Sequence, residues 1–288
     1  MFEPNPFAKE GTVNIIETRP RNVRILPNAR AICIKPDPKD RKAKPRVDDI
    51  DAFIARLPPH TLELIDIHYD SLLPRLPRLD GQGSIRYAHI GAHKLRDYSP
   101  LFGLTRLESL FLVSFPLPDL SAFQTRRLNY LRLIRGRVAH LDLSATAVFL
   151  QGCTNLKTFG TVSIDNLILG SCRRVDLASL AMVRGLRQLR LLAPGPLPSI
   201  APLRGCKSLE SLEITATPLG KTDFRVLGEM SSLKWLFLTV GDARVAELSK
   251  AFPRVMVTNG SVCFRASKSL PHEQYYRETE AATFVLGA

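Results

Sequence analysis

Apolar residues recur along this chain in a short, fixed pattern. Within a six-residue segment the first, fourth and sixth residues are apolar, and the residues between them vary. The clearest example is LNYLRL, residues 128–133, and eight further segments begin at residues 62, 85, 107, 145, 164, 186, 209 and 233. They follow one another every 21 to 24 residues, apart from one interval of 36 residues that holds two repeats. Such a period indicates a repeat architecture, because each unit needs its neighbours to bury its apolar side chains.

Each segment is predicted to be a β-strand. Successive side chains of a strand point to opposite faces, so the fourth and sixth residues share one face and the third and fifth share the other. In LNYLRL the pattern predicts that Leu131 and Leu133 are buried. We therefore expect Tyr130 and Arg132 to project from the face opposite the core.

The leucine spacing resembles that of the leucine-rich repeat family, whose segment is L-x-x-L-x-L-x-x-N/C-x-L. Almost every repeat matches the first half, over roughly residues 60–258, and the ninth position is cysteine at Cys153 and Cys172. The chain looks like the irregular bacterial type of this family. The resemblance implies an α/β solenoid, a curved array with a parallel β-sheet on its concave face and a mostly irregular or 3₁₀-helical convex side. It also implies that both cysteines are small buried groups that satisfy the backbone of a turn.

Three regions are predicted along the chain. Residues 1–59 contain strand-like segments and one helical segment, DDIDAFIARL, that would cap the first repeat. Residues 60–258 form the array of about nine repeats, and residues 259–288 form a C-terminal cap and a tail. A few helices are expected toward the C-terminus, because TDFRVLGEM and DARVAELSKAF combine a polar start with helical apolar spacing. The pattern leaves open whether the tail, residues 266–288, is ordered.

The third and fifth positions of the repeats are the candidate binding surface. A solvated sheet face is expected to carry short polar residues, yet this one is rich in Phe, Tyr, Trp and Arg, and aromatic residues and arginine are enriched at interface hot spots. The alternative is that a terminal segment of the same chain covers the face. The predicted partner-binding residues on the concave face are Tyr87, His89, Phe111, Tyr130, Arg132, Phe149, Arg190, Trp235 and Phe237.

The balance of charge favours an acidic partner. Forty Lys and Arg against 27 Asp and Glu give a net charge of +13, which suits either an acidic protein or a nucleic acid. The basic run KDRKAKPR, residues 39–46, is interpreted as a solvated loop, or else as a contact with such a partner. Further basic residues occur between Arg126 and Arg137 and at Arg173 and Arg174, but the strand register divides them between the concave face and the turns. A protein partner is therefore favoured over nucleic acid.

No motif predicts catalysis, a metal site or a cofactor. The five cysteines are widely spaced and form no C-x-x-C pair, which argues against both a disulfide framework and a zinc site. His89 and His93 have a spacing that suits a metal only on a helix, whereas here a strand and a turn are expected. Asp66 and His68 alternate onto one face and could form a local pair, but no nucleophile accompanies them. Phosphate-loop, dinucleotide-binding and nucleophile-elbow motifs do not occur.

These observations predict a non-enzymatic protein that recognises a partner protein on its concave face. The cysteine usage favours the cytoplasm, and no apolar run is long enough for a membrane span. We expect a monomer without membrane contact. A more specific hypothesis is an immunity-like protein that binds a toxin or an effector. Nucleic-acid binding through the basic clusters, and secretion as an effector that acts on host proteins, remain the alternatives.

Overall fold

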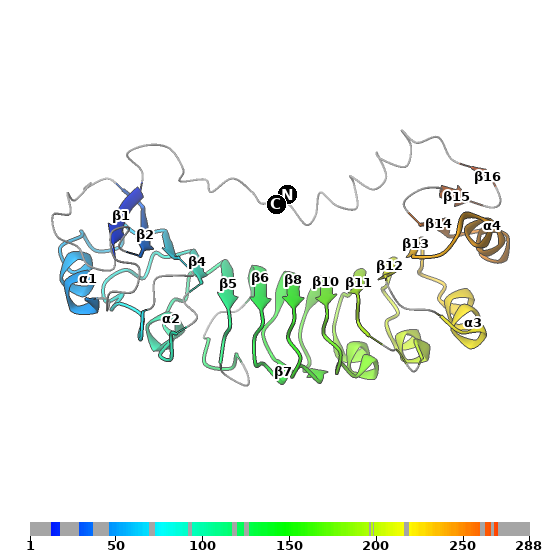
Figure 1. The fold of residues 1–288 in the computed structure, drawn as a ribbon, viewed down its shortest axis with the longest axis horizontal. Helices are drawn as coiled ribbons and strands as arrows, with labels where there is room; N and C mark the ends of the chain where they lie inside the picture. Colours follow the sequence, from blue (N-terminus) through cyan, green and yellow to red (C-terminus); the bar gives the residue numbers. More distant parts are fainter. Residues whose placement is uncertain are drawn as a thin grey trace. The chain divides into compact units, whose positions relative to one another are not determined.

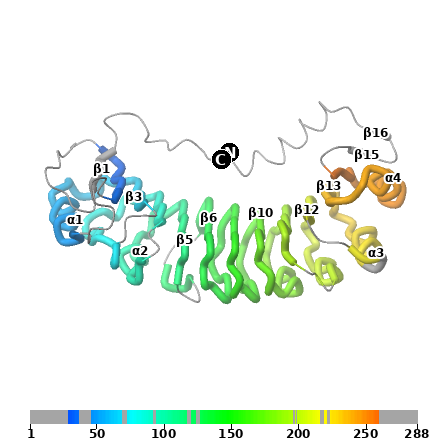
Figure 2. Tube along the Cα trace, viewed as in Figure 1, coloured from blue at the N-terminus to red at the C-terminus, as the bar shows by residue number. Residues whose placement is uncertain are grey.

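The computed structural model describes residues 13–17, 29–36, 46–68, 73–91, 94–116, 120–123, 127–195, 197, 199–215, 219–259, 263–265 and 268–269. The chain divides into two units, Glu3–Val138 and Ala139–Ala288. Both units consist of parallel strands joined by connecting segments that run away from the sheet (Figures 1 and 2).

The first unit is built on a parallel sheet in which every strand pairs with the next strand of the chain. Its strands are β1 (Val13–Glu17), β2 (Ala31–Lys35), β3 (Leu64–Ile67), β4 (Tyr87–Ile90), β5 (Ser109–Val113) and β6 (Leu128–Ile134). Its helices are α1 (Val47–Ile54) and α2 (Ser99–Phe102). The parallel pairing begins at β1 and β2, so the sheet starts well before residue 60.

The second unit repeats the same arrangement. A parallel sheet contains β8 (Ala145–Gln151), β10 (Ile164–Gly170), β11 (Gln188–Leu192), β12 (Ser211–Thr215), β13 (Trp235–Leu238) and β14 (Met256–Thr258), and it ends in antiparallel β15 (Cys263–Arg265) and β16 (Lys268–Ser269). The connecting segments hold the 3₁₀ helices η2 (Leu177–Met182) and η3 (Ala201–Gly205) and the helices α3 (Lys221–Glu229) and α4 (Asp242–Ala251). They also hold a two-stranded parallel sheet of β7 (His140–Leu141) and β9 (Thr158–Phe159).

The strands bury the residues that the sequence pattern predicts. In β5, Leu110 and Leu112 are fully buried, whereas Ser109 and Phe111 are half-buried. The same alternation occurs in β4, β11, β12 and β13. Burying one leucine side chain contributes about 1.5 to 3 kcal/mol, so the stacked leucines are the main source of stability. The fold class is thereby confirmed: an α/β solenoid with one parallel strand per repeat.

The predicted helices are also confirmed. DDIDAFIARL covers all of α1 except its first residue, TDFRVLGEM covers all of α3 except its first residue, and DARVAELSKAF contains α4. The small sheet of β7 and β9 was not predicted, because two-residue strands leave no periodic signal in the sequence. The connecting segments, expected to be mostly irregular or 3₁₀-helical, therefore carry some regular pairing as well.

The turns after β5, β6, β8, β10 and β11 use a left-handed backbone conformation at the eighth position of the repeat. The residues with positive φ there are Ser114, Arg135, Gly152, Ser171 and Ala193. This conformation lets the turn hydrogen-bond to the following strand; for example, the amide of Ser171 donates to the carbonyl of Leu192 over 2.8 Å. The ninth residue then points inward, and Phe115 at this position is fully buried.

Cys153 and Cys172 occupy this buried ninth position, as predicted. The Cys172 Sγ donates to the carbonyl oxygens of Leu150 and Gly170, each over 3.5 Å, and the Cys153 Sγ donates to the Gln151 carbonyl over 3.8 Å. The hydrogen bond with the Cys153 thiol, together with burial, raises the pKa of Cys172. Both thiols therefore serve the turn backbone.

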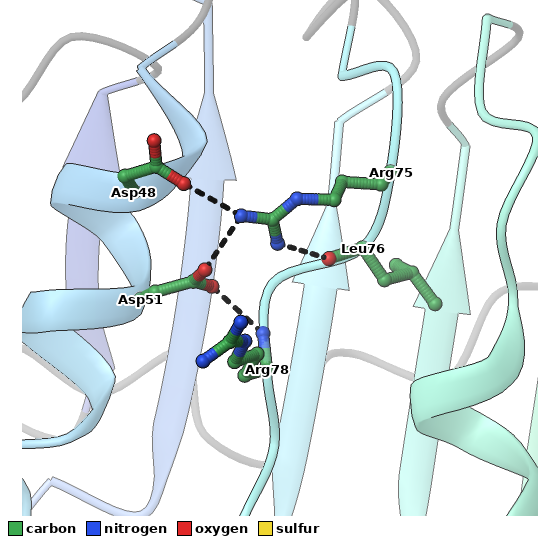
Figure 3. Close-up of polar contacts among 5 residues, drawn as sticks. All are labelled: Asp48, Asp51, Arg75, Leu76 and Arg78. Atoms are coloured by element: carbon green, nitrogen blue, oxygen red, sulfur yellow. Dashed lines mark hydrogen bonds and ion pairs between the residues drawn. The ribbon is translucent and has the colours of Figure 1, made fainter.

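An ionic network attaches helix α1 to the repeats (Figure 3). The Arg75 Nη2 donates to Asp48 Oδ1 over 2.8 Å and to Asp51 Oδ2 over 2.7 Å, while the backbone amide of Arg78 donates to Asp51 Oδ1 over 2.7 Å. On its other face α1 buries Ile50. Asp51 thus fixes the loop after β3 through two hydrogen bonds, one from the Arg75 side chain and one from the Arg78 backbone.

Some parts of the chain named in the sequence analysis lie outside the described residues. Among them are residues 39–45 of the basic run, His93, Arg126, and residues 266–267 and 270–288 of the tail.

Candidate functional site

All nine predicted partner-binding residues lie on the strand face opposite the leucine core, and all nine are half-buried. The structure divides them between the two units. The first-unit face is formed by the residues at the third and fifth positions of the repeats, which lie on strands β2 to β6, and it carries Tyr87, His89, Phe111, Tyr130 and Arg132. The second-unit face is formed by the corresponding residues of β8 to β14 and carries Phe149, Arg190, Trp235 and Phe237. Phe149 therefore belongs to the second unit.

The fifth positions of the first-unit face form one cross-strand row. Asp66 pairs with His89, His89 with Phe111, and Phe111 with Arg132 in successive strands. We call these four residues the charged stripe. The row continues to Cys33 of β2, which pairs with Asp66.

Ring contacts connect the middle of the charged stripe. The Arg132 Cζ lies 4.9 Å from the centroid of the Phe111 ring, and the His89 ring meets Phe111 edge-on with 6.0 Å between centroids. A guanidinium over an aromatic face contributes about 0.5 to 2 kcal/mol, depending on its solvation. Phe111 thereby orients the arginine and the histidine on either side of it.

Burial is the main influence on the pKa of His89. It lowers that pKa, Asp66 acts in the opposite direction, and the charge of Arg132 lowers the pKa further. Burial therefore favours the neutral form of the imidazole. Burial likewise raises the pKa of the Tyr130 hydroxyl, an effect that Arg132 partly offsets.

An ion pair lies beside the third-position residues of the same face. The Arg86 Nε and Nη2 donate to the two carboxylate oxygens of Glu108 over 2.7 and 2.8 Å. The Arg86 Cζ also lies 5.5 Å from the centroid of the Tyr87 ring. Arg86 was not recognised from the sequence, because the second position of the repeat was not considered as part of the face.

Cys33, Asp66 and His89 form a row that the sequence analysis missed. The Cys33 Sγ donates to Asp66 Oδ2 over 3.7 Å, and burial followed by the Asp66 charge raises the pKa of Cys33 to about 11. His89 lies two strands away from Cys33, about 9 to 10 Å across the sheet. A thiol that stays protonated and has no histidine in contact is not an activated nucleophile. The sequence signal for this row was AICI, residues 31–34, because its alternating pattern of side chains is similar to that of the later strands.

Asp66 also has a cross-strand neighbour that the sequence did not suggest. Asp66 pairs across the sheet with His89, whereas His68 follows the end of β3 and is exposed. Cross-strand neighbours are closer than residues two apart along one strand, which lie nearly 7 Å from each other.

On the second-unit face an ion pair is flanked by apolar residues. The Arg190 Nε lies 2.5 Å from Glu213 Oε2, and the two side chains are 36% and 18% exposed. In the same cross-strand row Phe237 follows Glu213, and Ile168 precedes Arg190. This pair is more shielded than an ordinary surface salt bridge, so it fixes the direction of the Arg190 side chain.

Several residues assigned to the exposed face are buried instead. They are Leu64, Ala147, Asn166 and Ile168. The burial of Ile168 is explained by the size of its neighbours, because it lies between the larger side chains of Phe149 and Arg190 in its cross-strand row. Asn166 is only 2% exposed, and its Nδ2 has no hydrogen-bond partner. The exposed part of the second-unit face is therefore smaller than the sequence pattern indicates.

The described residues contain no group of three His, Cys, Asp or Glu side chains that could hold a metal ion. His93, the expected neighbour of His89, lies outside them. Within the described part of the chain, no helix has the length and apolarity needed to cross a membrane. A cavity of about 500 Å³ in the first unit is lined by residues 78–81, 83, 99–100 and 103–104, none of which belongs to the first-unit face.

Comparisons with known proteins complete this description. No protein-family model matches the chain, and a search of curated proteins also gave no match. Among solved structures, the chain is similar to an internalin (InlF) from Listeria monocytogenes, with 17% identity, 86% of each chain covered and a TM-score of 0.40. At that score the likeness adds nothing to the fold assignment, which rests on the repeat pattern and the parallel strand pairing.

Proposed function

We propose that this protein is a non-enzymatic recognition scaffold that binds a partner protein on its first-unit face, with the second-unit face as an additional contact. The observation that carries the proposal is the row of half-buried aromatic side chains and arginine on strands whose opposite face is packed with leucine. Large side chains at such positions are not needed for the core. They are the residue types that dominate the energetics of protein interfaces.

The arrangement of the first-unit face supports this role physically. Arg132 already rests on Phe111, and Arg86 is held by both oxygens of Glu108. Side chains that are ordered before binding lose less conformational entropy when a partner arrives. Their ordering therefore favours affinity.

The partner is proposed to be acidic, because the chain has a net charge of +13. A toxin or an effector is one class of protein that would fit. We further propose that the protein acts in a reducing compartment such as the cytoplasm, since Cys33, Cys153, Cys172 and Cys206 are free thiols.

Affinity capture from an extract of the native cell tests the proposal. The double variant Tyr130→Ala with Arg132→Ala is expected to lose the partner, because truncating one interface anchor costs about 1 to 2 kcal/mol or more. Its melting temperature is expected to change by only a few degrees, since both positions lie outside the leucine core.

Asn129→Ala is the matched control, because this residue is exposed and belongs to the same strand, β6. The control is expected to capture the partner as the wild type does. Capture that survives in the double variant would disprove the proposed function.

A further inference from the structure

The cavity in the first unit lies apart from the residues proposed to bind the partner protein. Its lining comes from the connection between β3 and β4 and from helix α2 with the two residues that follow it. Its volume is about 500 Å³, within the range of about 300 to 1,000 Å³ that is usual for small-molecule sites. A molecule of the size of a dipeptide fits into this space.

The wall between β3 and β4 is fixed at both ends. At one end the backbone amide of Arg78 donates to Asp51 Oδ1 over 2.7 Å (Figure 3). At the other end the buried side chain of Gln82 accepts from the Leu62 amide through Oε1 and donates to the Pro58 carbonyl through Nε2, each over 3.1 Å. A wall that is ordered before a ligand arrives loses little conformational entropy on binding.

The wall at helix α2 is anchored by its apolar side chains. Leu101 is only 1% exposed, and the Phe102 ring meets the Phe123 ring edge-on with 5.1 Å between centroids. The amide of Leu104 donates to the Leu101 carbonyl over 3.1 Å and so fixes the end of the helix. Both walls of the cavity are therefore held by contacts that need no ligand.

The lining combines apolar side chains with two opposite charges. Leu79 and Leu104 are only 6% and 5% exposed, whereas Arg78 and Asp80 are exposed. Within the described part of the chain, neither of these charged side chains forms an ion pair or a hydrogen bond. The cavity thus offers one guanidinium and one carboxylate beside an apolar surface.

The spacing of the two charges suits a short zwitterion. Arg78 and Asp80 are two residues apart, so their Cα atoms are separated by at most about 7 Å. The ammonium and carboxylate groups of an extended dipeptide lie about 6 Å from each other. A guanidinium binds a carboxylate through parallel N–H bonds, and a carboxylate accepts the hydrogen bonds of an ammonium group.

We propose that this cavity binds an apolar dipeptide with free termini. Its carboxylate pairs with Arg78, its ammonium group pairs with Asp80, and its apolar side chains lie against Leu79 and Leu104. Burial of these side chains supplies the driving force, and the two charges select a zwitterion. The site is a second one, distinct from the surface proposed to bind the partner protein.

NMR titration of the full-length protein labelled with ¹⁵N-glycine tests the proposal, because three glycines line the cavity. The amide signals of Gly83 and Gly103 are assigned by their loss in Gly83→Ala and Gly103→Ala. An added Cβ at Gly83 would approach only the His60 ring, at 3.8 Å, and one at Gly103 would meet no atom within 4 Å. Leu-Leu is expected to shift both signals in a saturable way at millimolar concentration.

Two modified dipeptides separate the contributions of the charges. Ac-Leu-Leu has no ammonium group, and Leu-Leu-NH2 has no carboxylate. Each is expected to bind at least about threefold more weakly than Leu-Leu, the loss of one charge-assisted contact at an exposed site. Equal binding of all three compounds, or no shift of either glycine signal with Leu-Leu, overturns the proposal.

Charge-removing variants identify the contacts. Arg78→Gln is expected to bind Leu-Leu and Leu-Leu-NH2 equally, and Asp80→Asn to bind Leu-Leu and Ac-Leu-Leu equally. Arg106→Gln is the control, because Arg106 is an exposed residue of the same unit outside the lining, and it should keep both preferences. A preference that persists in its matching variant contradicts the proposed contact.

The titration and the capture experiment fail separately. The double variant at Tyr130 and Arg132 is expected to bind Leu-Leu as the wild type does, because neither residue lines the cavity. If the double variant retains the partner protein while Leu-Leu binds, only the proposed function is wrong. If Leu-Leu does not bind, this inference alone is wrong.

Discussion

At the scale of single residues, Asn166 is the clearest case of a polar group without compensation. Its Nδ2 is buried and has no hydrogen-bond partner, in the middle of strand β10. A buried polar group that is left unpaired costs about 1 to 3 kcal/mol. We therefore expect Asn166→Val to raise the free energy of unfolding by about 1 kcal/mol, since valine also suits a strand. Denaturant unfolding measures the change.

Asn259 provides the matched comparison for this prediction. Its Nδ2 donates to the Val240 carbonyl over 2.8 Å and to Asp242 Oδ1 over 2.9 Å. Asn259→Val is therefore expected to lower the free energy of unfolding. If the free energy of unfolding fell equally in both variants, Asn166 would have to make a stabilising contact.

His89 makes the stability of the protein depend on pH. Its pKa is lowered in the folded protein, mainly by burial, and then by Arg132 against the opposing effect of Asp66. As pH falls below about 6.5, the ordinary pKa of histidine, the unfolded chain takes up a proton before the folded one does. The contribution of His89 is thus fully present above that pH and is lost below it.

The variant His89→Gln tests this dependence, because it removes the titrating group and leaves the other histidines in place. We expect the wild type to lose more stability than His89→Gln between pH 7 and pH 5, as measured by urea unfolding. Parallel pH profiles for the two proteins would contradict the assignment.

At the scale of elements, the turns of the repeats depend on residues with positive φ. Ala193 adopts φ 46° and Gly185 adopts φ 74°. Glycine adopts such angles without penalty, whereas other residues pay about 1 kcal/mol. Ala193→Gly is therefore expected to stabilise the protein by up to about 1 kcal/mol, and Gly185→Ala to destabilise it by about as much. Thermal unfolding measures both.

Space and backbone angle can be separated in this experiment. A Cβ added at Gly185 would lie 3.5 Å from Asp165 Oδ1, an ordinary contact, so only the backbone angle opposes the change. Gly103 has φ −85° and no atom within 4 Å of an added Cβ. Gly103→Ala should therefore leave stability unchanged or raise it slightly, and a loss as large as that of Gly185→Ala would rule out the angle as the cause.

At the scale of the whole molecule, the excess of positive charge is expected to act on the rate of association. Neutral replacements of Lys39, Arg41, Lys42, Lys44 and Arg46 should leave capture of the partner at equilibrium nearly unchanged, because charges at the rim of an interface mainly steer the encounter. They should slow association at low salt, and the difference should disappear as salt is added. Association kinetics at two salt concentrations check this. If this variant lost the partner while the double variant at Tyr130 and Arg132 kept it, electrostatic binding would replace recognition by the first-unit face.

The sequence by itself determined which residues of each strand face the core. That information is local, because alternation along a strand places Leu131 and Leu133 on one face and Tyr130 and Arg132 on the other in any sheet. The repeat period likewise determined the parallel stacking, and helical spacing identified α1, α3 and α4. These features depend on neighbours within a few residues, or on identical units stacked next to one another.

Only the tertiary structure decided which of the outward residues meet and which remain exposed. The pairing of Asp66 with His89, and the stacking of Arg132 on Phe111, depend on the register between strands more than 20 residues apart. Ile168 is buried because larger side chains flank it on adjacent strands, a property of the row rather than of its own strand. The alternation of a strand specifies the direction of a side chain, whereas burial and contact depend on the sizes and charges of residues that other repeats contribute.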